Sequence, residues 1–315
     1  MPALPFPLPE NTSHPMPMDP PRHAVSHRLR IDGLSLHCIE YPGDGPPLVL
    51  LHSLTGNARI FDGLILAGLA DHFRVLVPEM CGRGQSETAF TQLSLADGLR
   101  HLLAWLDHFG IGSAALCGHS FGGLAALYAT DRAPARVSHL ALLDAAADMH
   151  PAAPALAAMA AIRLDGLYPS VQAYRDAVVR PASFSQPWHA AMQGFVEADL
   201  APVAPGIYTT AARSGTAHIA SLHVQSMAQR EWRDCAARVQ VPALLAQAAE
   251  PFWMGIPMLT DDGAGTTARL LRAPRVRIPG NHFTMLYGAG AERIVQALAP
   301  WSGQGTAEPA AAMTV

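Results

Sequence analysis

The chain has 315 residues, half of them hydrophobic and only 15% of them charged, and its formal net charge is −4. So much apolar material can bury a substantial core, which excludes a wholly disordered chain and predicts one large domain or one domain with an insertion. A weakly acidic chain without a basic cluster also argues against a nucleic-acid partner. We therefore expect the partner to be a neutral or apolar small molecule.

The two ends of the chain differ in composition from the rest. Residues 1–24 include eight prolines among the first 21 positions and predict a flexible tail, and residues 303–315, rich in small side chains, predict a second one. Neither a secretory signal nor an apolar stretch of about 18 residues, the length that spans a membrane, is recognisable. Four widely spaced cysteines without a Cys-x-x-Cys pair predict free thiols. We expect a cytoplasmic protein.

Between the tails, apolar strands alternate with amphipathic helices. This alternation predicts the α/β class, with a mostly parallel central sheet and helices on both of its faces. The expected strands are residues 28–32 and 35–39, which form a hairpin around Asp32-Gly33, followed by 48–51, 75–77, 111–116, 137–143, 241–246 and 275–278. The expected helices are residues 58–70, 95–109, a segment directly after Ser120, 266–271 and 291–298.

Residues 148–238 interrupt this alternation. The segment contains Ala-rich helical stretches that are repeatedly broken by proline. We interpret it as an inserted helical cap between two parts of one α/β core, residues 25–147 and 239–302. A cap that follows the strand at 137–143 would cover the carboxyl ends of the strands, where open sheets of this kind bind ligands.

One short motif indicates a catalytic serine. Residues 118–122 read Gly-His-Ser-Phe-Gly and stand between an apolar strand and a helix. A serine hydroxyl is a weak nucleophile unless it projects from a sharp turn towards a base, and the small neighbours of Ser120 permit such a turn. The amino terminus of the following helix would let the backbone amide of Phe121 point at an anionic oxygen. An inert glycine turn is the alternative interpretation of the motif alone.

With this motif and this order of strands, the chain resembles the α/β-hydrolase family over about residues 25–301. Three further segments support the resemblance: Leu-His-Ser-Leu-Thr-Gly at 51–56, Glu-Met-Cys-Gly-Arg-Gly-Gln-Ser at 79–86, and Pro-Gly-Asn-His-Phe at 279–283. The resemblance implies that the amides of Leu54 and Phe121 form an oxyanion hole. Because Ser53 replaces the usual glycine, Ser53 is a second candidate donor. It also implies a structural role for His52.

The catalytic base and acid follow from chain order. His282 lies in the loop after the last strand and can reach over the sheet to Ser120. The family most often places the acid after the seventh strand, where Glu250 is the nearest carboxylate in this chain. Asp144, after the sixth strand, is the alternative, at a position that resembles the one used by thioesterase domains. We favour Asp144 and keep Glu250 as second choice.

The resemblance implies a serine hydrolase that cleaves a carboxylic ester of an apolar small molecule through an acyl-enzyme intermediate. A thioester substrate is the nearest alternative, and a carbon–carbon bond hydrolase or a receptor-like relic that only binds ligand also stays open. Serine at position 120 excludes the branches with an aspartate nucleophile. Trp253 and Met254 are candidates for the substrate pocket. No cofactor or metal is expected.

Overall fold

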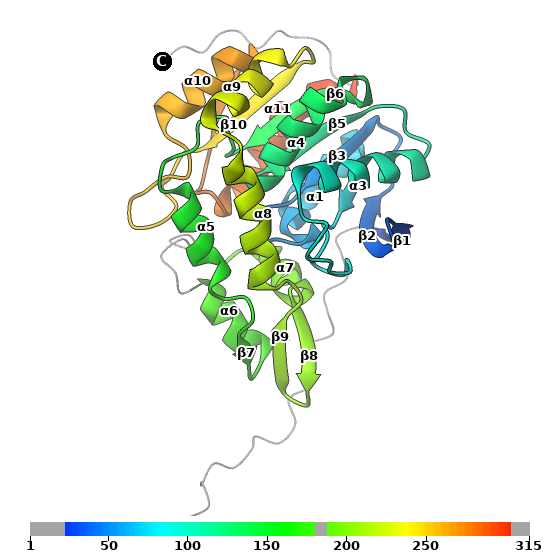
Figure 1. Ribbon diagram of the computed structural model, residues 1–315, viewed down its shortest axis with the longest axis vertical. Helices are drawn as coiled ribbons and strands as arrows, with labels where there is room; N and C mark the ends of the chain where they lie inside the picture. Colours follow the sequence, from blue (N-terminus) through cyan, green and yellow to red (C-terminus); the bar gives the residue numbers. More distant parts are fainter. Residues whose placement is uncertain (1–22, 180–187, 304–315) are drawn as a thin grey trace, which may run out of the picture.

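The computed structural model describes residues 23–179 and 188–303. Nearly all of the two predicted tails therefore lies outside the described residues. An eight-stranded sheet runs through the molecule in the order β1-β2-β4-β3-β5-β6-β10-β11 (Figure 1). The strands are β1 (Val25–Ile31), β2 (Leu34–Tyr41), β3 (Pro47–Leu51), β4 (Arg74–Pro78), β5 (Ala114–His119), β6 (Val137–Leu143), β10 (Ala243–Ala248) and β11 (Arg275–Ile278).

The sheet is mostly parallel, as predicted. Only β1 with β2 and β2 with β4 pair antiparallel, whereas β4, β3, β5, β6, β10 and β11 pair parallel with their neighbours. The β1–β2 hairpin turns at Asp32 and Gly33, which have φ of +50° and +85°. Positive φ at both central residues is typical of the two-residue turn that matches the twist of a hairpin.

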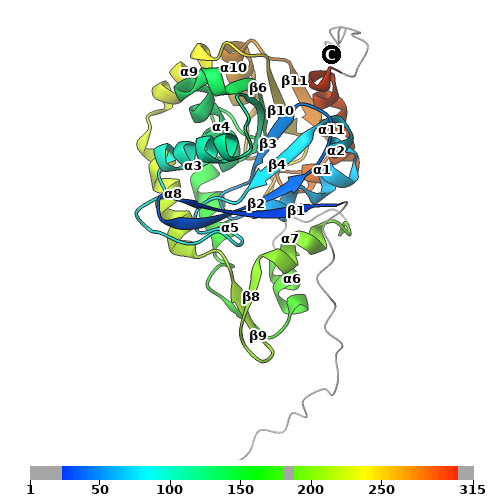
Figure 2. The same cartoon turned by 90° about the vertical axis from the view of Figure 1, so that its right-hand side faces the viewer.

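Helices cover both faces of the sheet, and Figure 2 shows the two layers on either side of it. Each layer has its own buried apolar cluster against the sheet. This arrangement confirms the predicted fold class. One layer holds α1 (Asp62–Leu66), α2 (Leu69–His72) and α11 (Gly288–Leu298), and the other holds α3 (Leu95–His108), α4 (Phe121–Arg132), α9 (Gln229–Arg238) and α10 (Asp261–Leu271).

Local signals explain where two of these elements begin and end. Ser94 caps α3 through a reciprocal pair of hydrogen bonds with Asp97, and Gly110 follows the helix at a φ of +66°. The single helix expected near residues 58–70 is instead broken into η1 (Ala58–Phe61), α1 and α2. Gly68, at a φ of +94°, adopts a conformation that ends a helix, and this separates α1 from α2.

Most of the elements between β6 and β10 project from the core on one side (Figure 1). They comprise the helices α5 (Ala153–Ala161), α6 (Val171–Val179), α7 (Met192–Ala198) and α8 (Ser214–Ser226), together with a small antiparallel sheet of β7 (Leu167–Tyr168), β9 (Ile207–Thr210) and β8 (Leu200–Ala204). The amino-acid sequence predicts helices alone in this segment, and the small sheet corrects that prediction. α9 packs against α4 and α10, so it belongs to the core layer although it falls within residues 148–238.

This topology brings three loops to one edge of the sheet. β5 leads into Ser120, β6 leads into Asp144, and β11 leads into the loop that carries His282. Because β5, β6, β10 and β11 run parallel, their carboxyl ends meet beneath the elements that project from the core. Within the described residues, no helix combines the length and apolar character that a membrane crossing requires.

Candidate active site

Ser120 occupies a strained turn between β5 and α4. Its φ of +56° and ψ of −122° are unusual for a residue with a side chain, and such conformations concentrate at functional sites. The flanking glycines make the turn possible because backbone carbonyl oxygens lie where a side chain would begin. A Cβ atom added at Gly118 would lie 2.1 Å from the carbonyl oxygen of Gly122, and one at Gly122 would lie 2.0 Å from that of Leu51.

His282 links Ser120 to a carboxylate. Its Nε2 lies 3.0 Å from the Ser120 Oγ, and its Nδ1 lies 2.7 Å from Oδ2 of Asp144. Since a carboxylate only accepts hydrogen bonds, Nδ1–H donates to Asp144, and Nε2 of the neutral ring is left to accept from the serine hydroxyl. This is the arrangement in which an imidazole can remove the proton of an attacking serine.

Asp144 is fixed by the backbone around it. It follows β6 directly, at a φ of +45°, and its side chain is 2% exposed. Its amide donates to the Ala246 carbonyl oxygen at 2.7 Å, and its Oδ1 accepts from the Ala248 amide at 3.0 Å. One carboxylate oxygen is therefore held by β10, which orients the other towards His282.

Glu250, the second-choice acid, lies two residues beyond the end of β10 and is partly buried. Its backbone amide donates to the Gly280 carbonyl oxygen at 3.1 Å. The carboxylate that bonds to His282 is nevertheless that of Asp144. On the β10 side, the ring of Phe252 contacts the imidazole edge-on, with the centroids 5.2 Å apart.

His119 supports the loop that carries His282. Its Nε2–H donates to the backbone carbonyl oxygen of His282 at 2.7 Å, and the two imidazole centroids lie 4.6 Å apart. Burial lowers the pKa of His119 well below its usual value, so this ring stays neutral beside His282. The amino-acid sequence does not indicate this role, because the partner lies 163 positions away.

The turn after β3 is held by two hydrogen bonds to one carbonyl oxygen. The Nδ1–H of His52 and the amide of Gly56 both donate to the Ser53 carbonyl oxygen, at 2.8 and 3.0 Å. Because a peptide unit is planar and trans, this fixes the Leu54 N–H on the opposite side, away from His52. Leu54 and Ser120 line the same cavity, and Phe121 begins α4 with an amide that has no acceptor within the helix.

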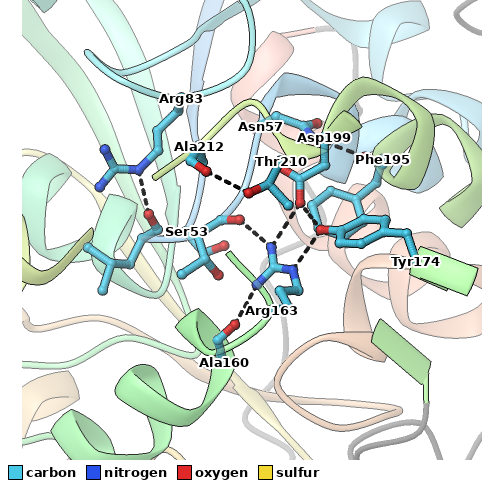
Figure 3. A network of polar contacts seen from close by, with 12 residues as sticks. Ser53, Asn57, Arg83, Ala160, Arg163, Tyr174, Phe195, Asp199, Thr210 and Ala212 are labelled. Carbon is cyan, nitrogen blue, oxygen red and sulfur yellow. Dashed lines mark hydrogen bonds and ion pairs between the residues drawn. The ribbon is translucent and has the colours of Figure 1, made fainter. Parts of the chain in front are cut away.

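Two largely buried arginines donate hydrogen bonds to the next two backbone carbonyl oxygens of that turn, as Figure 3 shows. Arg83 Nε donates to the Leu54 carbonyl oxygen at 2.7 Å, and Arg163 Nη2 donates to that of Thr55 at 2.6 Å. Arg163 also donates to the Tyr174 hydroxyl and pairs with Asp199, whose side chain is 0% exposed. This network is absent from the predictions made from sequence, although the lone cation within the apolar run at 156–164 is a signal that indicates it.

Comparison with known proteins identifies the fold family. A family model described as "alpha/beta hydrolase fold" matches residues 46–250, well over half of the chain. The chain belongs to this family. The predicted resemblance is therefore confirmed at the level of the family.

The names of matching relatives within the α/β-hydrolase family describe different activities. The dihydrolipoyllysine-residue acetyltransferase component of an acetoin cleaving system from Pseudomonas putida is 35% identical over 122 residues, which cover 38% of this chain and 32% of that protein. Lipase LipV of Mycobacterium tuberculosis is 33% identical over 114 residues, which cover 36% and 42%. Each match spans less than half of the relative.

Two solved structures share the fold over nearly their whole length. E-2-(acetamidomethylene)succinate hydrolase superposes with a TM-score of 0.76 at 20% identity, covering 88% of this chain and 98% of that one. The thioesterase domain from the curacin biosynthetic pathway superposes with a TM-score of 0.70 at 15% identity, covering 90% and 100%. At these identities the likeness establishes the α/β-hydrolase fold alone.

The two pocket residues expected from the sequence have different surroundings. Trp253 lines the cavity beside Ser120 and His282. The prediction for Met254 is wrong, because its side chain is 81% exposed. Met254 and Gly255, with φ of +46° and +80°, form the tip of a tight turn closed by the bridge between Trp253 and Ile256, and this turn directs Met254 away from the cavity.

Two fully buried imidazoles should make this α/β hydrolase less stable below about pH 6.5. Burial lowers the pKa of His52 to about 4 and that of His119 well below its usual value, whereas both titrate near 6.5 in the unfolded chain. Protonation would also remove the acceptor at His52 Nε2, which the Met80 amide uses at 3.1 Å.

The direction in which the free energy of unfolding changes with pH follows from proton binding. Above pH 6.5 both rings are neutral in the folded and in the unfolded protein. Between pH 6.5 and about 4 the unfolded chain binds more protons at these two rings than the folded protein does. The free energy of unfolding should then fall by up to about 1.4 kcal/mol per pH unit for each of the two histidines. Below about pH 6 the buried carboxyl of Asp62 opposes this loss, because burial raises its pKa to about 6 and the folded protein then binds that proton first. Urea unfolding at pH 7.5, 7.0, 6.5 and 6.0 measures this slope above the range in which Asp62 offsets it. A free energy that stays constant over this range would contradict the prediction.

Proposed function

We propose that this α/β hydrolase cleaves carboxylic esters of apolar small molecules through a covalent acyl-enzyme intermediate. Ser120 is the nucleophile, His282 is the general base and acid, and Asp144 orients the imidazole. The observation that carries the proposal is the pair of hydrogen bonds at His282, 3.0 Å to Ser120 and 2.7 Å to Asp144. It combines with the strained turn that exposes the serine at the sheet edge.

The reaction begins when Ser120 Oγ attacks the ester carbonyl carbon and its proton passes to His282 Nε2. The carbonyl oxygen becomes an oxyanion that the amides of Leu54 and Phe121 stabilise, with the Ser53 amide as the second candidate donor. Collapse breaks the bond to the alcohol oxygen, which takes the proton from Nε2 and leaves as the alcohol. A water molecule then repeats both steps on the acyl-enzyme, releases the carboxylic acid and restores Ser120.

Thioester cleavage is the second candidate, and the position of the acid favours it. Asp144 stands at the end of β6, a position that resembles the one used by thioesterase domains, and it is the carboxylate that bonds to His282. The same sequence of steps applies, with a thiol in place of the alcohol as leaving group. A panel of matched oxygen esters and thioesters of one acyl chain distinguishes the two by the ratio of their kcat/KM values.

Covalent labelling tests the nucleophile. We expect a fluorophosphonate to label the native protein once, with the adduct mapped to Ser120 by mass spectrometry, and to leave the urea-unfolded protein unlabelled because the activating imidazole is then displaced. The native protein should also turn over p-nitrophenyl esters repeatedly. Labelling without repeated turnover would instead support a receptor-like protein, and the absence of both would refute the proposed hydrolase.

A further inference from the structure

Two cavities meet at Ser120. One has a volume of about 510 Å³ and the other of about 370 Å³, and each alone is within the range of about 300–1,000 Å³ that small-molecule sites occupy. Their walls share Leu54, Ser120, Ala157 and Met258. A molecule that reacts at Ser120 can therefore extend into a separate space on either side of the serine.

The two spaces differ in which catalytic groups they contain. The larger one, here called the histidine-side cavity, includes His282 in its wall, with Phe195, Phe252, Trp253 and Phe283 around it. The smaller one, here called the helix-side cavity, includes Phe121 and Leu124 of α4 in its wall, together with Met149, Val224 and Trp232. Both walls are predominantly apolar.

The direction of proton transfer assigns the two parts of the substrate. The leaving oxygen must take its proton from Nε2 of His282, so it has to lie within hydrogen-bond reach of that atom. The oxyanion lies at the amides of Leu54 and Phe121, and the acyl group takes the remaining direction from the carbonyl carbon. His282 lines the histidine-side cavity and not the helix-side cavity.

We propose that the histidine-side cavity binds the alcohol part of the substrate and the helix-side cavity binds its acyl chain. The preferred substrate class then consists of esters with a bulky apolar group on both sides of the ester bond. This inference rests on the proposed function, since it presumes acyl transfer at Ser120.

The charges of the histidine-side cavity further require an uncharged alcohol part. Arg163 is the cation in its wall, and it donates to Thr55, Ala160, Tyr174 and Asp199. The buried carboxylate of Asp199 balances the charge of the guanidinium. A carboxylate on the alcohol part would therefore enter an apolar space without a cation committed to it, which is unfavourable.

Four esters test the assignment in the unmodified protein: ethyl acetate, hexyl acetate, ethyl hexanoate and hexyl hexanoate. Lengthening either side by four methylenes should raise kcat/KM by about tenfold or more, because each methylene leaves water for an apolar wall. The acetate ester of 6-hydroxyhexanoate, which adds a carboxylate to the alcohol part, should react about tenfold or more slowly than hexyl acetate. Equal rates for the charged and uncharged esters would overturn the uncharged-alcohol assignment.

Two matched variants separate the cavities. Ala160 lines only the histidine-side cavity and Val224 only the helix-side cavity, and both side chains are partly exposed, so a larger residue changes the cavity with little disturbance of the core. Ala160→Phe should abolish the advantage of hexyl over ethyl acetate and keep that of hexanoate over acetate. Val224→Phe should do the reverse. The assignment would be overturned if Ala160→Phe abolished the advantage of hexanoate over acetate and Val224→Phe abolished that of hexyl over ethyl acetate.

Deacylation provides a second readout, because the alcohol has already left at that stage. Rapid-mixing kinetics with p-nitrophenyl hexanoate should show the deacylation rate changed by Val224→Phe and unchanged by Ala160→Phe. Hydrolysis without dependence on either chain length would refute this inference and leave the proposed function standing. Absence of hydrolysis of every ester, together with absence of fluorophosphonate labelling, would refute the proposed function itself.

Discussion

Replacing Ser120 with alanine should lower kcat for p-nitrophenyl esters by about a millionfold, the size of effect that removal of the nucleophile has in serine hydrolases. The variant retains both cavities and the imidazole but has no oxygen that can form the acyl-enzyme. Fluorophosphonate labelling should disappear with the activity. Steady-state kinetics and intact-protein mass spectrometry measure the two effects on one preparation.

The fold should survive this substitution. The strain at Ser120 comes from a Cβ atom at a φ of +56°, and alanine carries the same Cβ atom, so the turn is neither relieved nor made worse. The Ser120 amide still donates to the Leu143 carbonyl oxygen at 3.0 Å. Urea unfolding should therefore have nearly the wild-type midpoint.

Ser226→Ala is the matched control for Ser120→Ala. Ser226 is exposed at the end of α8 and lines neither cavity, and its hydroxyl donates to the His223 carbonyl oxygen at 2.8 Å. This variant should retain both turnover and labelling. Substantial turnover in Ser120→Ala, or loss of activity in Ser226→Ala, would contradict the assignment of Ser120 as nucleophile.

The sequence predicts the core of the fold well because its signals are local. The succession of strands and helices along the chain follows from alternating apolar runs and helix stripes. Ser120 is found because its turn needs glycines at 118 and 122 for close backbone approach. His282 follows from chain order. Each of these inferences uses residues that are neighbours in sequence or a rule of topology that holds for parallel sheets.

The features that the sequence does not reveal depend on contacts between distant residues. Arg163 pairs with Asp199 and reaches Thr55, which lies 108 positions earlier, and neither interaction leaves a spacing pattern. β8 and β9 are short, and Pro202 is unfavourable within a strand, so the small sheet gives little signal. The exposure of Met254 depends on the positive φ of Met254 and Gly255, which cannot be inferred from the hydropathy of the sequence.

The choice between Asp144 and Glu250 as the partner of His282 also depends on a contact between residues that are distant in sequence. Chain order allows both Asp144 and Glu250 to precede His282, and each follows a strand of the central sheet. The deciding contact is the bond of Asp144 Oδ1 to the Ala248 amide, which turns the other oxygen towards the imidazole. That bond joins β6 to β10 across 104 positions, so only the assembled sheet reveals it.

Asp144→Asn should lower kcat by about 10⁴-fold, and Glu250→Gln should leave it close to the wild-type value. The asparagine carbonyl can keep the bond that Oδ1 accepts from the Ala248 amide at 3.0 Å. Its NH₂ group then faces His282 Nδ1 and can only donate. The imidazole must accept at Nδ1, so its proton moves to Nε2, where it prevents the ring from taking the serine proton.

The two variants are matched, because each replaces a carboxylate by the amide of the same shape at the end of a neighbouring strand. KM should change little for Asp144→Asn, since Asp144 lines neither cavity, and the loss should therefore fall on kcat. Loss of turnover in Glu250→Gln with activity retained in Asp144→Asn would transfer the role to Glu250. Such a result would require the histidine loop to rearrange before reaction, because the imidazole already donates to Asp144 at 2.7 Å.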